Sequence, residues 1–377
     1  YLVSNRSLTS LDLTDVGISV PGCKALGEAL EKNATLQILR LDHNASIGVR
    51  GLTILGDSLT RNLGLSTLSL TYCLLEGPDA AALIQWMTPR NIGEAEVGQC
   101  LYVPIIDDQG GLINDPVLLK LAEDRFWLSI ADSDVQLYAL GLALGRGMDV
   151  RISEPDVSPL AVQGPKSEAL LTALFGEHIR EIGFFRFGWI EFEGRKQLIA
   201  RSGYSRQGGF EIYLNGSEHG PALWDAIWNA GQAHNIAPGC PNLIERIEGG
   251  LLSYGNEMTR TTNPLEVGMG RYCSLDGSVD YIGRAALERI AERGVDRQIR
   301  GVTFDGGPVP TCSKPWPVRV ADQEVGTITS AIWSPRLGCN VGQALIAQPF
   351  WAPGQPVTVQ SQDEVLRTGT ISALPFA

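Results

Sequence analysis

Two polar side chains on one predicted strand near the middle of the chain could recognise a heterocyclic ligand. A glycine-rich turn over residues 200–208 leads into an alternating stretch at 209–214, which predicts a β-strand. Along such a strand Glu211 and Tyr213 face one side, while Phe210 and Ile212 face the other. A carboxylate next to a phenol on one strand face suits the recognition of a flat, nitrogen-rich ring.

Other common catalytic arrangements are missing from the sequence. Its four histidines share no metal-ligand spacing, and no Ser/His/Asp or Cys/His pattern is present. The seven cysteines are scattered and include no CxxC pair. Such cysteine usage favours reduced thiols and therefore an intracellular protein, in the cytoplasm or, in a eukaryotic cell, in the mitochondrion.

Length and charge limit the classes of protein to which the chain can belong. With 377 residues, two or three domains are expected. Residues 1–75 carry six basic and six acidic side chains, so the net charge of −12 resides in 76–377. This acidity argues against nucleic acid and anionic membranes as partners. No apolar run reaches the roughly 18 residues that a membrane span needs. The sequence begins at Tyr1 rather than with a methionine, which indicates a fragment or a trimmed sequence.

The amino-terminal part of the chain is repetitive. A Leu-x-x-Leu-x-Leu pattern recurs at spacings of 28 and 29 residues, beginning at Leu8, Leu36 and Leu65. Leucines at helical spacing follow the first two copies, the second group being Leu52, Leu55 and Leu59. Strand, turn and helix at this period are typical of leucine-rich repeats, and the period resembles the ribonuclease-inhibitor-like class. Because only about two and a half repeats are present, they are expected to be part of a longer array.

The rest of the chain predicts mixed α and β structure. Strands are expected at 100–106, 112–121, 126–130, 160–163, 188–193, 196–200 and 209–214, and helices at 79–88, 134–145, 165–175 and 221–234. Beyond residue 297, short strands at 299–304, 317–321, 324–330 and 357–359 are separated by Gly and Pro. These strands predict a small β-barrel at the carboxyl end.

Six segments of this larger part resemble, in order and spacing, the family of the glycine-cleavage T-protein, the tetrahydrofolate-dependent methyl and aminomethyl transferases. The segments are 110–115, 163–167, 200–213, 243–256, 263–268 and 281–283. Within the family, residues 130–134, 239–246 and 374–376 resemble the dimethylsulfoniopropionate demethylase branch. T-protein carries two aspartates after its paired glycines, the first of them important for releasing ammonia, whereas this chain has Asn114 followed by Asp115. Since an amide cannot serve as that carboxylate, the departure favours simple methyl transfer.

The resemblance implies direct transfer of a methyl group from a sulfonium sulfur to N5 of tetrahydrofolate, with no metal or redox cofactor. Because a sulfonium is a good leaving group, the protein mainly has to position the reactants. A cationic substrate is stabilised by aromatic faces, and the resemblance implies Tyr102, Asp115 and Tyr213 as catalytic residues. The residues that it implies for the folate cofactor, with Glu211 hydrogen-bonding the pterin, are Glu211, Tyr204, Ser129, Arg246 and Asn114.

Each of these assignments has a structural alternative. Tyr102 and Tyr213 could belong to the core, and Glu211 could pair with a surface arginine. Arg246 lies between two glutamates, so a structural ion pair is an alternative to its expected role as the anchor of an anionic group. Asp115 could be a turn residue before a proline.

The expected fold is an α/β leucine-rich-repeat fragment followed by an α+β three-lobed, T-protein-like folate-binding fold with a carboxyl-terminal β-barrel. The expected domains are 1–75, 76–290 and 291–377. Leucine-rich repeats stand where the family has an amino-terminal stretch that contributes to the pocket rim. The second domain is therefore expected to be incomplete at its amino-terminal end, through a natural fusion or a mis-joined gene.

The expected activity is demethylation of dimethylsulfoniopropionate to 3-(methylthio)propionate, with formation of 5-methyltetrahydrofolate. A glycine-cleavage-type aminomethyltransferase, which would need a lipoyl carrier protein, and another folate-dependent demethylase are the enzymatic alternatives. A non-catalytic leucine-rich-repeat binding protein with an inactive transferase region is the alternative of a different class. The repeats could have a protein partner, and the chain could form a homodimer.

Overall fold

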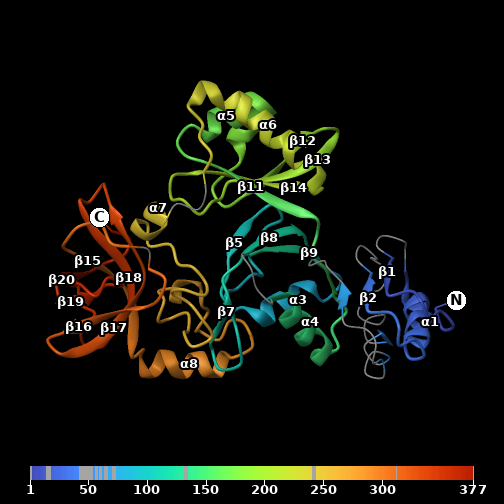
Figure 1. Cartoon of the computed structure of the whole chain (residues 1–377), viewed down its shortest axis with the longest axis horizontal. Helices are drawn as coiled ribbons and strands as arrows, with labels where there is room; N and C mark the ends of the chain where they lie inside the picture. Colours follow the sequence, from blue (N-terminus) through green and yellow to red (C-terminus); the bar gives the residue numbers. More distant parts are fainter. Residues whose placement is uncertain are drawn as a thin grey trace. The chain divides into compact units, whose positions relative to one another are not determined.

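The computed structural model describes residues 2–13, 18–41, 54–55, 58, 62, 67–69, 74–130, 135–239, 243–310 and 312–376 (Figure 1). The chain divides into two compact units, each built from separate stretches of sequence. The first unit comprises residues 1–83, 120–128 and 132–156, and the second comprises 84–119, 129–131 and 157–377.

The amino-terminal residues of the first unit form the predicted leucine-rich repeats. Three short parallel strands, β1 (Ser10–Asp12), β2 (Ile38–Arg40) and β3 (Thr67–Ser69), lie side by side in sequence order. Their register pairs Leu11 with Leu39 and Leu39 with Leu68, so the sequence spacings of 28 and 29 residues are the spacings between neighbouring strands. Helix α1 (Val20–Leu30) follows β1. The buried core of this region contains Cys23, Leu30, Leu36, Leu39, Leu41 and Leu55.

Parts of several predicted features lie outside the described residues. In the second predicted repeat helix Leu55 is helical, whereas Leu52 and Leu59 lie outside. Residues 131–134 and 240–242, which belong to two of the three segments resembling the demethylase branch, also lie outside.

An asparagine ladder joins successive repeats. Asn5, Asn33 and Asn62 recur at the repeat spacing, and Asn33 is only 1% exposed. The Nδ2 of Asn62 donates to the carbonyl of Asn33 at 2.8 Å, and the Nδ2 of Asn33 donates to the carbonyl of Asn5 at 3.0 Å. The Oδ1 of Asn33 accepts the N–H of Leu36 at 2.8 Å. These bonds satisfy backbone groups in the turns before each strand, a role that the leucine pattern alone did not indicate.

Replacing Asn33 by alanine is expected to destabilise the repeat region by about 2 kcal/mol, because buried backbone groups lose their partners. Hydrogen exchange measured by mass spectrometry on the full chain would show faster exchange over residues 2–41. The neighbouring Lys32→Ala, at an exposed position, is the matched control and is expected to change little. Equal protection in both variants would mean that the ladder contributes nothing to stability.

The remainder of the first unit contains short antiparallel strands. Strand β4 (Leu74–Glu76) pairs with β9 (Arg125–Ser129) on one side and β10 (Arg151–Ile152) on the other. The carboxylate of Glu76 lies 2.7 Å from Arg151 and 3.5 Å from Arg125, which ties the three strands together. The helices near these strands are α3 (Ala80–Met87) and α4 (Val135–Arg146).

The second unit contains a four-stranded antiparallel sheet in the order β11-β14-β13-β12. Helices α5 and α6 pack on one face of it (Figure 1), where Leu171 and Leu223 join the strand residues Ile199, Phe210 and Ile212 in a buried core. The bounds are β11 (Val157–Gln163), α5 (Ser167–Phe175), η1 (Glu177–Glu181), β12 (Phe187–Phe192), β13 (Arg195–Ala200), β14 (Gly209–Asn215), η2 (Ser217–His219), α6 (Gly220–Gly231) and η3 (Gln232–His234).

Two short strand pairs, two α-helices and one 3₁₀ helix lie in this unit outside the barrel. Each of the predicted strands 100–106 and 112–121 is divided in two, since β5 pairs with β8 and β6 pairs with β7. The division places a turn at residues 115–116, between Asn114 and Val117. The bounds are β5 (Cys100–Tyr102), β6 (Ile105–Ile106), β7 (Leu112–Asn114), β8 (Val117–Ala122), α7 (Leu243–Glu248), η4 (Gly270–Tyr272) and α8 (Arg284–Arg293).

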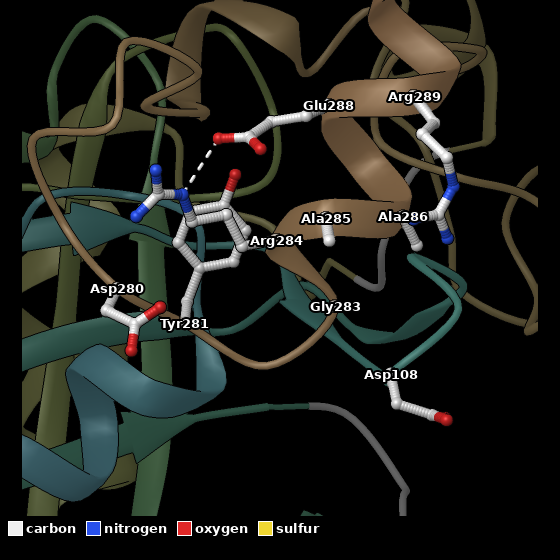
Figure 2. Close-up of a pocket in the computed structure, with 9 residues that line it drawn as sticks. All are labelled: Asp108, Asp280, Tyr281, Gly283, Arg284, Ala285, Ala286, Glu288 and Arg289. Atoms are coloured by element: carbon white, nitrogen blue, oxygen red, sulfur yellow. Dashed lines mark hydrogen bonds and ion pairs between the residues drawn. The ribbon is translucent and has the colours of Figure 1, made fainter.

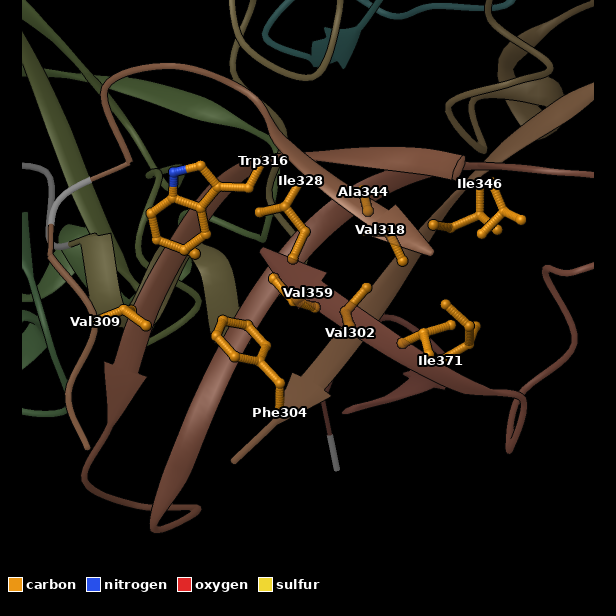
Figure 3. Close-up of a cluster of buried hydrophobic side chains, with 13 residues drawn as sticks. Val302, Phe304, Val309, Trp316, Val318, Ile328, Ala344, Ile346, Val359 and Ile371 are labelled. Atoms are coloured by element: carbon orange, nitrogen blue, oxygen red, sulfur yellow. The ribbon is translucent and has the colours of Figure 1, made fainter. Parts of the chain in front are cut away.

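The predicted carboxyl-terminal barrel is confirmed. Six antiparallel strands close in the order β15-β18-β17-β16-β19-β20. Phe304 and Trp316, whose rings meet edge to face at 6.5 Å, lie in its interior with Val302, Ile328 and Ile346 (Figure 3). The bounds are β15 (Arg297–Phe304), β16 (Trp316–Val320), β17 (Gln323–Ser334), β18 (Cys339–Ala347), β19 (Pro356–Gln360) and β20 (Leu366–Ser372).

Candidate functional site

The two faces predicted for strand β14 are present. Phe210 and Ile212 are buried in the core beneath α5 and α6, and the alternation of the strand turns Glu211 and Tyr213 to the opposite face. Glu211 is paired in register with Ala200 of β13, at the centre of the sheet. The sheet therefore holds the carboxylate and the phenol on one rigid surface.

A glycine turn tied to Gln163 leads the chain into this strand. Gly209 has φ +142°, and a Cβ there would lie 2.5 Å from the carbonyl oxygen of Val162. The Nε2 of Gln163 donates to the carbonyls of Ser202 at 3.1 Å and Phe210 at 3.0 Å, so it spans the turn. Only glycine fits this close approach, which explains why the glycine pair at 208–209 precedes the strand.

Glu211 and Tyr213 share a mostly buried polar cluster. The hydroxyl of Ser202 donates to Oε2 of Glu211 at 2.5 Å. Burial raises the pKa of Glu211, and this hydrogen bond opposes the rise. Burial, followed by the negative charge of Glu211, raises the pKa of Tyr213, while a hydrogen bond with Ser129 lowers it. The thiol of Cys100 has its pKa raised to about 12 by burial and by Glu211, so it is a neutral neighbour.

Tyr102 and Asp115 form a hydrogen-bonded pair. The phenol of Tyr102 donates to Oδ2 of Asp115 at 2.6 Å. Burial raises the pKa of Asp115 to about 6, whereas the Tyr102 bond lowers it. Asn114 is 2% exposed, and its Oδ1 accepts the N–H of Asp115 at 2.8 Å. The Nδ2 of Asn114 is buried without a hydrogen-bond partner among the described residues.

Tyr204 lies between these groups and a buried ion pair. Its hydroxyl donates to the carbonyl of Leu252 at 2.6 Å, and its side chain is partly exposed. Burial raises the pKa of Tyr204 to about 12, with Arg246 opposing the rise and Glu257 and Asp115 adding to it. Tyr204 is therefore within electrostatic range of both the Asp115 carboxylate and the Arg246–Glu257 pair.

Arg246 belongs to a buried network that joins α7 to the barrel. Its Nη1 lies 2.9 Å from Oε2 of Glu257, and its Nη2 donates to the hydroxyl of Ser330 at 2.6 Å. Arg246 is 4% exposed and Glu257 1%. The structural ion pair considered as an alternative thus exists, although its partner is Glu257 rather than a neighbour on the helix.

Strand β5 connects the polar cluster of Glu211 and Tyr213 with the Tyr102–Asp115 pair. Cys100 and Tyr102 are two residues apart on this strand, so their side chains point to the same face, about 7 Å apart. Cys100 interacts electrostatically with Glu211, and Tyr102 binds Asp115. The structure therefore brings the eight predicted site residues into one region of the second unit.

Three members of this region were not predicted from sequence. Ser202, Glu257 and Cys100 contact or electrostatically influence predicted residues. Ser202 lies inside the 200–213 segment, where a hydroxyl nine residues before a carboxylate gives no signal until the sheet pairs β13 with β14. Among the structural alternatives, the described ion pairs include none between Glu211 and an arginine.

The hollow shown in Figure 2 lies elsewhere in this unit. It has a volume of about 460 Å³ and is lined by the start of α8, where Arg284 and Glu288 form an ion pair at 2.8 Å. None of the predicted site residues lines it. In the described part of the chain no three His, Cys, Asp or Glu side chains gather as a metal site, and no helix there is long and apolar enough to cross a membrane.

Comparison with known proteins matches the two parts of the chain to different families. The description "GCVT N-terminal domain" matches residues 65–277, and "Glycine cleavage T-protein C-terminal barrel domain" matches residues 297–377. The description "Leucine Rich repeat" matches residues 4–27 and 32–55.

Individual proteins agree with these matches. The dimethylsulfoniopropionate demethylase DmdA of Ruegeria pomeroyi is 48% identical over 289 residues, which cover 77% of this chain and 79% of that protein. An aminomethyltransferase of Clostridium botulinum is 32% identical over 305 residues, covering 79% of this chain and 81% of that protein.

The solved structure of the glycine cleavage system aminomethyltransferase T from Bartonella henselae superposes with a TM-score of 0.73 at 22% identity, covering 81% of this chain and 83% of that one. This likeness confirms the T-protein-like fold. Together with the matches over residues 65–277 and 297–377, it confirms the resemblance seen in the six segments, and the chain belongs to the glycine-cleavage T-protein family.

Proposed function

We propose that the chain is a tetrahydrofolate-dependent methyltransferase that demethylates dimethylsulfoniopropionate to 3-(methylthio)propionate, forming 5-methyltetrahydrofolate. The observation that carries the proposal is the 48% identity with the Ruegeria pomeroyi demethylase over 289 residues. The domain division at residues 75 and 290 is part of the proposal, with the repeats as a separate region that binds a protein partner.

The residues on β14 fit a reduced folate. Glu211 is half-buried, and Ser202 donates to one of its two carboxylate oxygens. A carboxylate in that setting can accept N–H groups from the edge of a pterin in a bidentate pairing. The free Nδ2 of Asn114 supplies a buried donor in the same region. When bound, the folate would supply the nucleophilic nitrogen N5, which takes the methyl group and gives up its own proton to solvent.

The neighbouring groups suit a cationic sulfonium. Tyr102 and Tyr204 present aromatic rings, and Asp115 lies among them as a carboxylate that is ionised at neutral pH. Aromatic faces and a carboxylate both attract a cation. The sulfur keeps the electron pair of the broken carbon–sulfur bond, so no residue has to protonate a leaving group. The work of these residues is to hold the donor in line with the acceptor and to exclude water.

The test is an anaerobic incubation of the purified chain with tetrahydrofolate and dimethylsulfoniopropionate, followed by mass spectrometry of both products. Equal, enzyme-dependent formation of 5-methyltetrahydrofolate and 3-(methylthio)propionate is expected. Parallel reactions receive an aminomethylated lipoyl carrier protein or other methylated donors. Turnover only with the carrier protein would establish the aminomethyltransferase instead, and folate binding without any turnover would indicate the non-catalytic alternative.

The reaction is expected to depend on the ionisation of Asp115. Burial raises its pKa to about 6, so the group is neutral below that pH and attracts the sulfonium less. The kcat/KM for the donor should therefore rise between about pH 5 and about pH 7 and level off above the pKa of the free enzyme. Asp115→Asn should lower kcat/KM at neutral pH by roughly tenfold or more and remove this inflection. Asp108→Asn, at an exposed turn position, is the matched control. An unchanged pH profile in Asp115→Asn would assign the inflection to another group.

A further inference from the structure

Two arginines stack on one tyrosine ring next to the candidate site. The guanidinium carbon of Arg90 lies 5.0 Å from the centroid of the Tyr272 ring, and that of Arg271 lies 4.8 Å from it. Arg271 also donates to the hydroxyl of Tyr272 at 2.8 Å. Arg90 is half-buried, whereas Arg271 is exposed. We call Arg90, Tyr272 and Arg271 the arginine clamp.

The clamp carries two positive charges that no carboxylate of the described residues neutralises. Arg90 and Arg271 form no ion pair there, while Arg297 lies 2.8 Å from Glu266 and Arg260 lies 3.0 Å from Asp107 in the same unit. Burial lowers the pKa of Arg90, and Arg271 lowers it too, against the favourable effect of Tyr272. Because the two like charges repel each other, an anion bound beside them would be stabilised.

Hydrogen bonding and ring packing connect the clamp to the candidate site. The Nη1 of Arg90 donates to the backbone carbonyl of Tyr102 at 2.7 Å. The ring of Tyr272 meets the ring of Tyr102 edge to face, with centroids 5.4 Å apart. Tyr102 in turn binds Asp115. The clamp therefore adjoins the Tyr102–Asp115 pair, and its guanidinium groups have several N–H donors that no carboxylate of the described residues occupies.

We propose that Arg90 and Arg271 form an anion subsite that takes a carboxylate of the bound reactants and thereby selects for them. A planar guanidinium fork held against an aromatic ring matches a carboxylate in a bidentate pairing. The subsite deepens the proposed function and rests on it for the identity of the ligands. The carboxylate has two possible sources there, the propionate of the sulfonium donor and the glutamate of tetrahydrofolate.

The test is a cycle in which the arginine and the carboxylate are removed separately and together. Isothermal titration calorimetry on the full chain gives dissociation constants for the wild type and Arg271→Gln. One arm compares dimethylsulfoniopropionate with its neutral carboxamide. The other arm compares tetrahydrofolate with tetrahydropteroate, which lacks the glutamate. In the arm whose carboxylate binds the clamp, removing that carboxylate should weaken binding to the wild type by about tenfold. It should weaken binding to Arg271→Gln by much less.

Further variants separate charge from fold. Arg271→Lys keeps the charge without the fork and should recover only part of the lost affinity. Arg90→Gln should remove the same coupling from the half-buried side of the clamp. Arg289→Gln, an exposed arginine on α8 outside the clamp, should bind every ligand like the wild type.

The outcomes distinguish this subsite from the proposed reaction. Coupling in the sulfonium arm assigns the subsite to the donor, and coupling in the folate arm assigns it to the acceptor. A wild type that shows coupling but no turnover would refute the reaction and keep the subsite. Equal losses for charged and neutral ligands in both arms, or failure of the wild type to bind any of them, would overturn the subsite.

Discussion

Glu211→Gln is expected to weaken tetrahydrofolate binding roughly a hundredfold, which corresponds to about 3 kcal/mol. The carboxylate stands on a rigid central strand with one oxygen already bound by Ser202. A carboxamide has the same shape, but one of its two acceptors becomes a donor, so it meets the N–H edge of a pterin with the wrong group. Fluorescence titration with tetrahydrofolate would measure the loss, and kcat/KM for methyl transfer should fall at least as far.

Two further substitutions test the cause of this loss. Ser202→Ala removes the hydroxyl that orients Glu211 and should weaken folate binding only several-fold. Glu191→Gln makes the same chemical change at an exposed position of β12 and should bind folate like the wild type. If Glu211→Gln bound tetrahydrofolate as tightly as the wild type, the pterin would have to lie elsewhere.

Local periodicity made much of the fold predictable. The leucine spacing of 28 and 29 residues is the spacing of the paired strands β1, β2 and β3, because each repeat contributes one strand. The alternation around Phe210 and Ile212 gave the two faces of β14 for the same reason. Where the period of the apolar side chains matches the period of burial, the sequence is sufficient to predict the element.

The barrel strands β18 and β20 were not predicted, because polar and apolar residues do not alternate regularly along them. Asn340 and Gln343 of β18 are fully buried polar residues that bind loops and the Arg246 network. Their partners come from distant segments, so these polar residues interrupt the apolar pattern that a short window could detect. β20 contains Gly369, whose Cβ would lie 2.7 Å from the carbonyl oxygen of Thr303, a packing requirement that depends on barrel closure.

The candidate site, like the fold, was only partly predictable from the sequence. The eight site residues, six of them inside the family segments, were predicted from the resemblance, and the structure places them in one region. Ser202 and Glu257 were missed because their roles depend on tertiary partners, nine residues away in sequence for Ser202 and up to 73 for Glu257. The partner of Arg246 could not be inferred from the two glutamates beside it, since side chains adjacent on a helix point in different directions.

The largest expected effect on stability comes from the Arg246–Glu257 pair. Arg246→Met is expected to lower the free energy of unfolding of this region by about 3–5 kcal/mol, because it leaves a buried carboxylate without its counter-charge. Glu257 would keep the N–H of Ser253 and the hydroxyls of Thr329 and Ser330, but no cation. Urea denaturation followed by tryptophan fluorescence would measure the change, with the exposed Arg289→Met as the matched control.

The double variant Arg246→Met/Glu257→Gln decides between the two roles considered for this arginine. If Arg246 mainly neutralises Glu257, removing both charges should restore more than half of the lost stability, since a neutral amide is far easier to bury than an unpaired carboxylate. If it mainly anchors an anionic group of the ligand, the single variant should stay stable and lose folate affinity. Because Arg246 is almost fully enclosed by Glu257, Ser330 and protein backbone, we expect the first result. The electrostatic effect of Arg246 on Tyr204 would then reach the site only through a pair that holds α7 against the barrel.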